Sequence, residues 1–267
     1  MAGAVSWAGR RIGRMMARYL SRHVRHYRPF SITSPEKMRR VLQTGDVLLV
    51  EGKKRISTAI KYLTQSTWSH AALYVGEDVP GVPLSPEGER LCLIEVDLQA
   101  GSIASPLSKY ADFNTRICRP VGLPLQPRLA VARYMLDNLG LTYDLRNIVD
   151  LARYLLPIPP VPSHWRQRML AFGSGEPTQA ICSSLIARAF HSVHYPVLPF
   201  IEKPETPKND SHREVLHVAH HSLFVPRDFD LSPYFAVVKP TIETGFDYES
   251  LPLYGWEKRK APALPEN

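Results

Sequence analysis

Short apolar runs separated by glycine, proline and polar residues characterise the first half of the chain. Four runs have the length and composition of β-strands: residues 47–50, 70–75, 91–97 and 116–120. Three further segments are expected to form helices: residues 36–43, 57–64 and 127–139. The pattern therefore predicts a strand-rich first half with short helices between and after the strands.

Helical spacing returns in the second half at residues 147–156 and 179–193, and a last strand is expected at 234–238. Residues 196–233 are dense in proline, histidine and charge and carry few structural signals. Early strands, later helices and a late strand favour an α+β domain over a doubly wound sheet. We expect this domain to span residues 31–240, followed by a loosely attached tail at 241–267.

The composition allows a substantial core and predicts a reducing environment. The chain has 267 residues, 44% of them hydrophobic, and three cysteines that do not form a disulfide framework. No apolar run approaches the roughly 20 residues that a membrane-spanning helix needs. Residues near Met1 also lack the apolar core of a secretory signal. A cytoplasmic location is the expectation from these features.

Residues 1–30 carry most of the net charge. They contain seven arginines and no acidic residue, whereas the whole chain has a net charge of +8. At helical spacing the arginines share one face and most of the apolar residues share the other. Such a basic amphipathic helix suits an anionic membrane surface, here the inner membrane face, or it packs its apolar stripe on the domain. The remainder is nearly neutral, so nucleic acid is not expected as a partner.

A cysteine at the start of a predicted helix is the first candidate for chemistry. Cys182 opens the segment in which Leu185, Ile186 and Phe190 form an apolar stripe. Backbone N–H groups at a helix N-terminus stabilise a thiolate, and those around Cys182 and Ser183 are placed to supply part of an oxyanion hole. A buried structural cysteine remains the alternative. Cys92 and Cys118 fall inside predicted strands and are interpreted as structural.

A histidine and a carboxylate on neighbouring predicted strands could complete the site. His70 enters a strand, and the small residue beside it, Ser69, leaves room for a substrate. Glu95 is central in the next strand and would orient the imidazole, ahead of Asp97. The alternatives are a hydrogen-bonded core histidine and an exposed strand-edge carboxylate.

Metal and cofactor chemistry find little support in the sequence. Histidines cluster at positions 191, 194, 217, 220 and 221, but no zinc motif accompanies them. A glycine-rich nucleotide loop and a lipase-type serine elbow are also missing from the sequence. We therefore expect no metal and no cofactor.

Four short motifs occur in a distinctive order: Gly45-Asp46-Val47-Leu48-Leu49, Trp68-Ser69-His70, Ile94-Glu95 and Ile181-Cys182-Ser183-Ser184-Leu185. Their order and spacing over roughly residues 42–240 resemble the circularly permuted NlpC/P60 group, the YiiX/YaeF-like branch of papain-like thiol hydrolases. The resemblance implies a papain-like fold, in which an antiparallel sheet carries the base and packs against a helix that begins at the nucleophile.

The same resemblance assigns roles to individual residues. It implies Cys182 as nucleophile, His70 as base, Glu95 as the third member, and Tyr143 as a residue near the cysteine. The expected function is a cysteine hydrolase of the amidase or peptidase type that forms an acyl-enzyme on an amide or ester. A lipid acyltransferase or thioesterase, with a lipid substrate, and an inactive membrane-associated binding module are the alternatives.

Overall fold

A computed structural model of the chain describes Pro29 and residues 33–97, 100–141, 181–202, 215–218 and 224–245. The predicted helix at 1–30, apart from Pro29, the predicted helix at 147–156 and the predicted site residue Tyr143 lie outside the described residues. Among the helices that are described, none is both long and apolar enough to cross a membrane.

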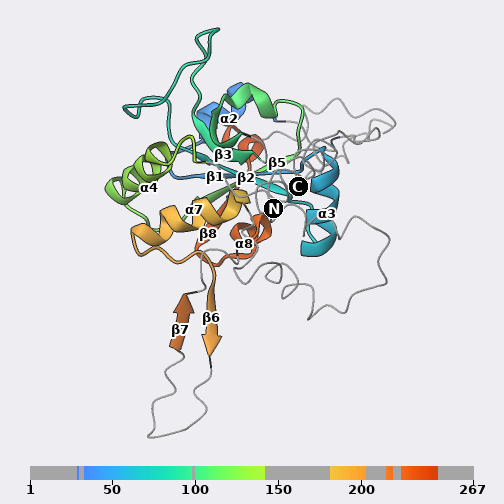
Figure 1. Cartoon of the computed structure of the whole chain (residues 1–267), viewed down its shortest axis with the longest axis vertical. Helices are drawn as coiled ribbons and strands as arrows, with labels where there is room; N and C mark the ends of the chain where they lie inside the picture. Colours follow the sequence, from blue (N-terminus) through green and yellow to red (C-terminus); the bar gives the residue numbers. More distant parts are fainter. Residues whose placement is uncertain are drawn as a thin grey trace, which may run out of the picture.

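Six antiparallel strands form the central sheet of this α+β fold (Figure 1). Their order across the sheet is β4 (Gly101–Ser105), β3 (Leu93–Asp97), β2 (His70–Tyr74), β1 (Val47–Val50), β5 (Thr115–Pro120) and β8 (Phe235–Val238). β1 and β2 are buried along almost their whole length because they are central and covered on both faces. The predicted α+β class and the five predicted strands are thereby confirmed.

Two helices cover one face of the sheet. α4 (Leu125–Asp137) packs against α7 (Ile181–Ser192), and both contact β2 (Figure 1). α7 turns Leu185, Ile186 and Phe190 into the core, where none of these side chains is exposed. This apolar stripe fixes the position of Cys182, one helical turn earlier, over the sheet.

Shorter elements cover the opposite face. α2 (Pro35–Val41) begins where Ser34 accepts a hydrogen bond from the Lys37 N–H and Pro35 occupies the first turn. It packs against the 3₁₀ helix η1 (Leu107–Tyr110). Met38 and Leu107 join the core on this side. The polar side chains of η1 are thereby held close to β3.

The remaining elements connect or flank the sheet. α3 (Arg55–Thr64) joins β1 to β2, α8 (Pro226–Leu231) packs against β8, and α9 (Pro240–Glu243) contacts α2. β6 (Pro199–Glu202) and β7 (Val215–Val218) form a separate antiparallel pair that projects away from the sheet (Figure 1). Residues 196–233 therefore contain more regular structure than their few sequence signals indicated, namely β6, β7 and α8.

The Gly45-Asp46 motif has a structural explanation. Gly45 has φ +88°, a left-handed conformation that glycine adopts without strain. Asp46 is fully buried, and its carboxylate accepts hydrogen bonds from Arg119 and from the Gln43 N–H. The backbone of both residues pairs with Tyr74, the last residue of β2. The motif thus fixes where β1 begins relative to β2.

Candidate functional site

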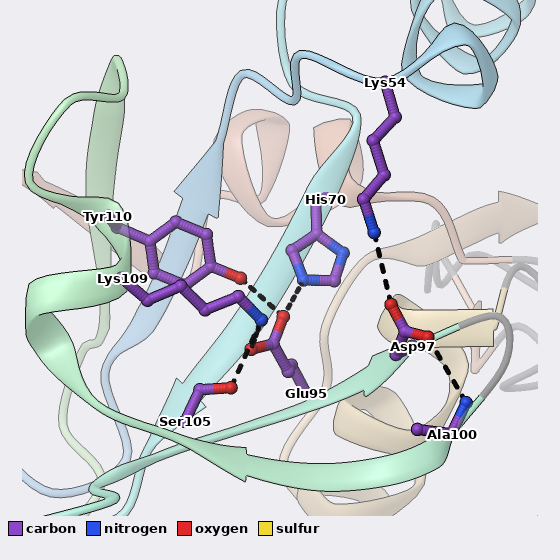
Figure 2. A network of polar contacts seen from close by, with 8 residues as sticks. All are labelled: Lys54, His70, Glu95, Asp97, Ala100, Ser105, Lys109 and Tyr110. Carbon is purple, nitrogen blue, oxygen red and sulfur yellow. Dashed lines mark hydrogen bonds and ion pairs between the residues drawn. The ribbon is translucent and has the colours of Figure 1, made fainter. Parts of the chain in front are cut away.

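His70 and Glu95 meet on the sheet face opposite α7. His70 is the first residue of β2, and the register between β2 and β3 places Glu95 across from Ala72, two residues further along the same face. The imidazole Nε2 lies 2.5 Å from Glu95 Oε2 (Figure 2). This contact leaves Nδ1 as the ring nitrogen that can face another group.

Glu95 is held by two further donors. Its side chain is only 3% exposed. The Lys109 ammonium lies 2.5 Å from Oε1, and the Tyr110 hydroxyl donates to Oε2 (Figure 2). Burial alone would raise the pKa of Glu95, but the hydrogen bond and charge of His70, followed by those of Lys109, outweigh it and hold that pKa well below its usual range. Glu95 is therefore a carboxylate at every physiological pH.

Cys182 is the second residue of α7 and lies beside the start of β2. His70 and the backbone N–H groups of Ala71 and Ser183 lie close enough to its thiol to act on its pKa. Burial would raise the pKa of Cys182, but the hydrogen bond and positive charge of His70, with the two N–H groups, lower it below that of an ordinary thiol. The structure thus brings Cys182, His70 and Glu95 together.

The imidazole responds in the opposite direction. Burial disfavours the charged ring, yet contact with Cys182 and then with Glu95 raises the pKa of His70 to about 10. A lowered pKa of the thiol and a raised pKa of the imidazole beside it both favour a thiolate–imidazolium ion pair. Such a pair holds a nucleophile and a proton donor in contact, which is what acyl transfer requires.

The other two cysteines have a different environment. Cys92 and Cys118 are fully buried. Burial raises the pKa of Cys92 to about 11 and that of Cys118 still further. Neither is expected to react as a thiolate near neutral pH, so both serve as internal controls for Cys182.

Ser69 and Ser183, two of the predicted substrate-contacting residues, use their hydroxyl groups in hydrogen bonds to the backbone. The Ser69 hydroxyl accepts a hydrogen bond from the Gly52 N–H at 2.9 Å. The Ser183 hydroxyl donates to the Phe224 carbonyl oxygen at 2.6 Å. Both side chains are buried, so each supports the loop or helix around the site, and Ser183 also offers its backbone N–H to Cys182.

The sequence did not reveal Lys109 and Tyr110 as members of the site. Both lie on η1, which follows β4, and neither element was predicted. The one available signal was indirect, because a carboxylate in the middle of an apolar strand requires a partner. Nothing in the spacing indicated which lysine or tyrosine would provide that partner.

The described part of the chain contains no group of three or more histidine, cysteine, aspartate or glutamate side chains arranged to hold a metal ion. Two of the clustered histidines, His220 and His221, lie outside that part.

Comparison with known proteins gives distant likenesses among solved structures alone. No family model and no curated protein matches the chain. Among solved structures, the chain is similar to the crystal structure of the metalloprotein yiiX (DUF1105) from Escherichia coli O157:H7. The sequence identity is 16%, the TM-score is 0.42, and the match covers 74% of this chain and 96% of that one. A likeness of this size does not assign the chain to a family.

Proposed function

We propose that the protein is a cysteine hydrolase that cleaves an amide or ester through an acyl-enzyme on Cys182. The observation that carries this proposal is the position of His70, which contacts the Cys182 thiol on one side and the buried Glu95 carboxylate on the other. A nucleophile, a base and an orienting carboxylate in contact form the arrangement that covalent acyl transfer uses.

Acylation begins from the ion pair. The Cys182 sulfur attacks the carbonyl carbon and forms a C–S bond, while the carbonyl π electrons move to oxygen. We assign the N–H groups of Ala71 and Ser183, which lie against the sulfur, as the donors nearest to that oxyanion. The oxyanion then collapses, the bond to the leaving nitrogen or oxygen breaks, and His70 gives its proton to the leaving group.

Deacylation reverses these roles. The neutral His70 takes a proton from water, and the resulting hydroxide attacks the thioester carbonyl. The C–S bond breaks and releases a carboxylic acid product. Cys182 returns as a thiolate beside a protonated His70, so no oxidant, reductant or cofactor is consumed. Glu95 keeps Nε2 hydrogen-bonded throughout and thereby holds Nδ1 toward the sulfur.

We also infer that the fold is the permuted, papain-like arrangement of the NlpC/P60 group. The strand that begins with His70 and the strand that bears Glu95 precede the helix that begins near Cys182. The sheet is antiparallel and packs against that helix. This order of base, carboxylate and nucleophile supports the inference, as do the motifs that resemble the family.

A lipid substrate is the second candidate, and residues 1–30 favour it. Seven arginines without an acidic residue would attract an anionic membrane surface and place the enzyme at the cytoplasmic side of a membrane. Acyl transfer to a lipid or water would use the same thioester on Cys182. A peptide or other amide substrate requires no such attachment.

Mass spectrometry of the protein after incubation with cell extract tests both forms of the proposal. We expect an acyl adduct on Cys182 that hydroxylamine removes, with Cys92 and Cys118 unmodified in the same molecules. The mass of the adduct distinguishes a fatty acyl group from a peptidyl group. Complete absence of an adduct from Cys182, together with its failure to react with iodoacetamide faster than the two control cysteines, would contradict the proposal.

A further inference from the structure

Without Lys109, the buried site has a net negative charge. The Cys182 thiolate and the Glu95 carboxylate contribute two negative charges, whereas the His70 imidazolium contributes one positive charge. An uncompensated charge in a buried site is costly, and it would raise the pKa of the thiol. The Lys109 ammonium brings the sum to zero.

We propose that Lys109 is a positioning residue that balances the charge of the site and thereby keeps Cys182 ionised at neutral pH. The proposal rests on the proposed function, because it concerns how readily the same nucleophile forms. Lys109 acts through Glu95 and contacts neither the sulfur nor the imidazole in the contacts that define the site.

The geometry divides the two oxygens of Glu95 between different partners. Oε1 receives Lys109, whereas Oε2 receives His70 and Tyr110 (Figure 2). The ammonium therefore offsets the carboxylate charge without competing for the oxygen that orients the imidazole. Ser105 at 3.2 Å and the Tyr110 ring, whose centre is 5.4 Å away, further restrict the ammonium.

Tyr110 supplies position without charge. Burial first, and then the charge of Glu95, raise the pKa of its hydroxyl well above the usual value, so it remains a neutral donor. Tyr110 is itself buried and anchors η1 against the sheet. Because Tyr110 can hold Glu95 in place, the contribution that only Lys109 can make is its positive charge.

Other charged groups near Glu95 do not remove the imbalance. Within the described ranges, the titratable or charged side chains around it are His70 from β2, Cys182 from α7, Lys109 and Tyr110 from η1, and the pair formed by Lys54, just before α3, and Asp97, at the end of β3. Lys54 and Asp97 form their own ion pair at 3.2 Å, which has no net charge (Figure 2).

The pH dependence of Cys182 alkylation by iodoacetamide provides the test, because it needs no known substrate. Lys109→Met and Lys109→Gln should each raise the midpoint pH by about one unit, which is about a tenfold loss of rate below the midpoint. Lys109→Arg keeps the charge and should keep the midpoint near that of the unmodified chain. Two neutral variants of different polarity guard against a result caused by misfolding of one.

Lys54→Met is the matched control. Lys54 has a side chain 39% exposed, compared with 38% for Lys109, and it also pairs with a carboxylate of β3. Because it does not contact Glu95, its removal should shift the midpoint by no more than about 0.3 units.

A second readout separates charge balance from simple support of Glu95. Loss of a nearby cation raises the pKa of His70, whereas displacement of Glu95 away from the imidazole lowers it. NMR titration of His70 in Lys109→Met should therefore show a higher pKa than in the unmodified chain. A lower pKa, or a Cys182 midpoint no different from that of Lys54→Met, would overturn the proposal.

These outcomes are distinct from failure of the proposed function. If Cys182 in the unmodified chain is alkylated no faster than Cys92 and Cys118, the nucleophile itself is wrong. If Cys182 reacts selectively but Lys109→Met leaves its midpoint unchanged, the hydrolase proposal stands and the role of Lys109 falls.

Discussion

His70 lies between two anions, and each of them stabilises its protonated form. Glu95 supplies a fixed negative charge because it is buried among donors, whereas the charge on Cys182 depends on pH. The raised pKa of His70 means that the imidazolium persists through neutral pH and is lost only in alkaline solution. Activity that depends on the ion pair should therefore rise as Cys182 ionises and fall as His70 loses its proton.

Glu95→Gln tests the contribution of the fixed charge. The amide keeps the shape of the side chain but removes the anion that lies 2.5 Å from Nε2. We expect the pKa of His70 to fall by about 1–3 units, measured by NMR titration of the imidazole. Asp97→Asn removes a carboxylate from the same strand, and it should leave that pKa nearly unchanged. An equal fall in both variants would show that Glu95 has no special role.

The sequence alone identified the three candidate residues of the site, each for a separate reason. His70 entered an alternating segment, Glu95 lay within an apolar strand, and Cys182 preceded an apolar helical stripe. The structure brings these three together. The sequence could not identify Lys109 and Tyr110 as donors to Glu95, because their position depends on the turn that follows β4 and on how η1 packs against α2.

Among the elements, the central strands and α7 were the most predictable. Val47–Val50 is a continuous apolar run bounded by polar residues, and the stripe of α7 recurs at helical spacing. β4 consists mainly of small and polar residues, so only its pairing with β3 identifies it as a strand. β6 and β7 similarly depend on a pairing across an intervening segment.

The ion pair between Asp46 and Arg119 connects β1 and β5 with the end of α2. Arg119 also donates to the Val41 carbonyl oxygen at 2.6 Å. Arg119→Met leaves the buried Asp46 without its cation, so we expect a loss of about 3 kcal/mol in the free energy of unfolding, measured in urea. Arg39→Met breaks an exposed pair with Glu77 and should cost less than about 1 kcal/mol. Similar losses in the two variants would contradict this account of the motif.

An aromatic cluster anchors α7 against α8 and β8. Phe190 is fully buried and contacts Phe229 and Phe235. Phe190→Ala should lower the free energy of unfolding by about 3–5 kcal/mol, because the cavity cannot be filled by its packed neighbours. Leu125→Ala, at a side chain 63% exposed, should change it by no more than about 0.5 kcal/mol. Thermal and urea unfolding would measure both, and a small loss for Phe190→Ala would show that α7 is anchored elsewhere.

Across the chain, the site combines segments that are distant in sequence. The site residues follow one another in the chain as His70, Glu95, the η1 residues and Cys182. They converge because β2 pairs with β3 and because α7, which packs on the other face, begins beside the start of β2. The chain order could be read from the sequence, but the convergence depends on sheet pairing and helix packing. The resemblance to a permuted family supplied that expectation in advance.

Residues 1–30 carry a separate expectation that concerns the location of the protein. Deletion of residues 1–28 should abolish binding to vesicles that contain phosphatidylserine, measured by co-sedimentation, because seven arginines are lost. Binding of the full chain should weaken as salt is raised and should be weak on vesicles of phosphatidylcholine alone. Equal binding by the full and shortened chains would contradict a membrane role for this segment.

The most direct test of the central claim is the pH at which Cys182 becomes reactive. Alkylation by iodoacetamide should have a midpoint below the value of about 8.5 typical of a free thiol, because His70 and two backbone N–H groups stabilise the thiolate. In His70→Gln the same buried thiol loses its cation, so its midpoint should move above that value. A midpoint at or above about 8.5 in both proteins would contradict the claim that Cys182 is an activated nucleophile.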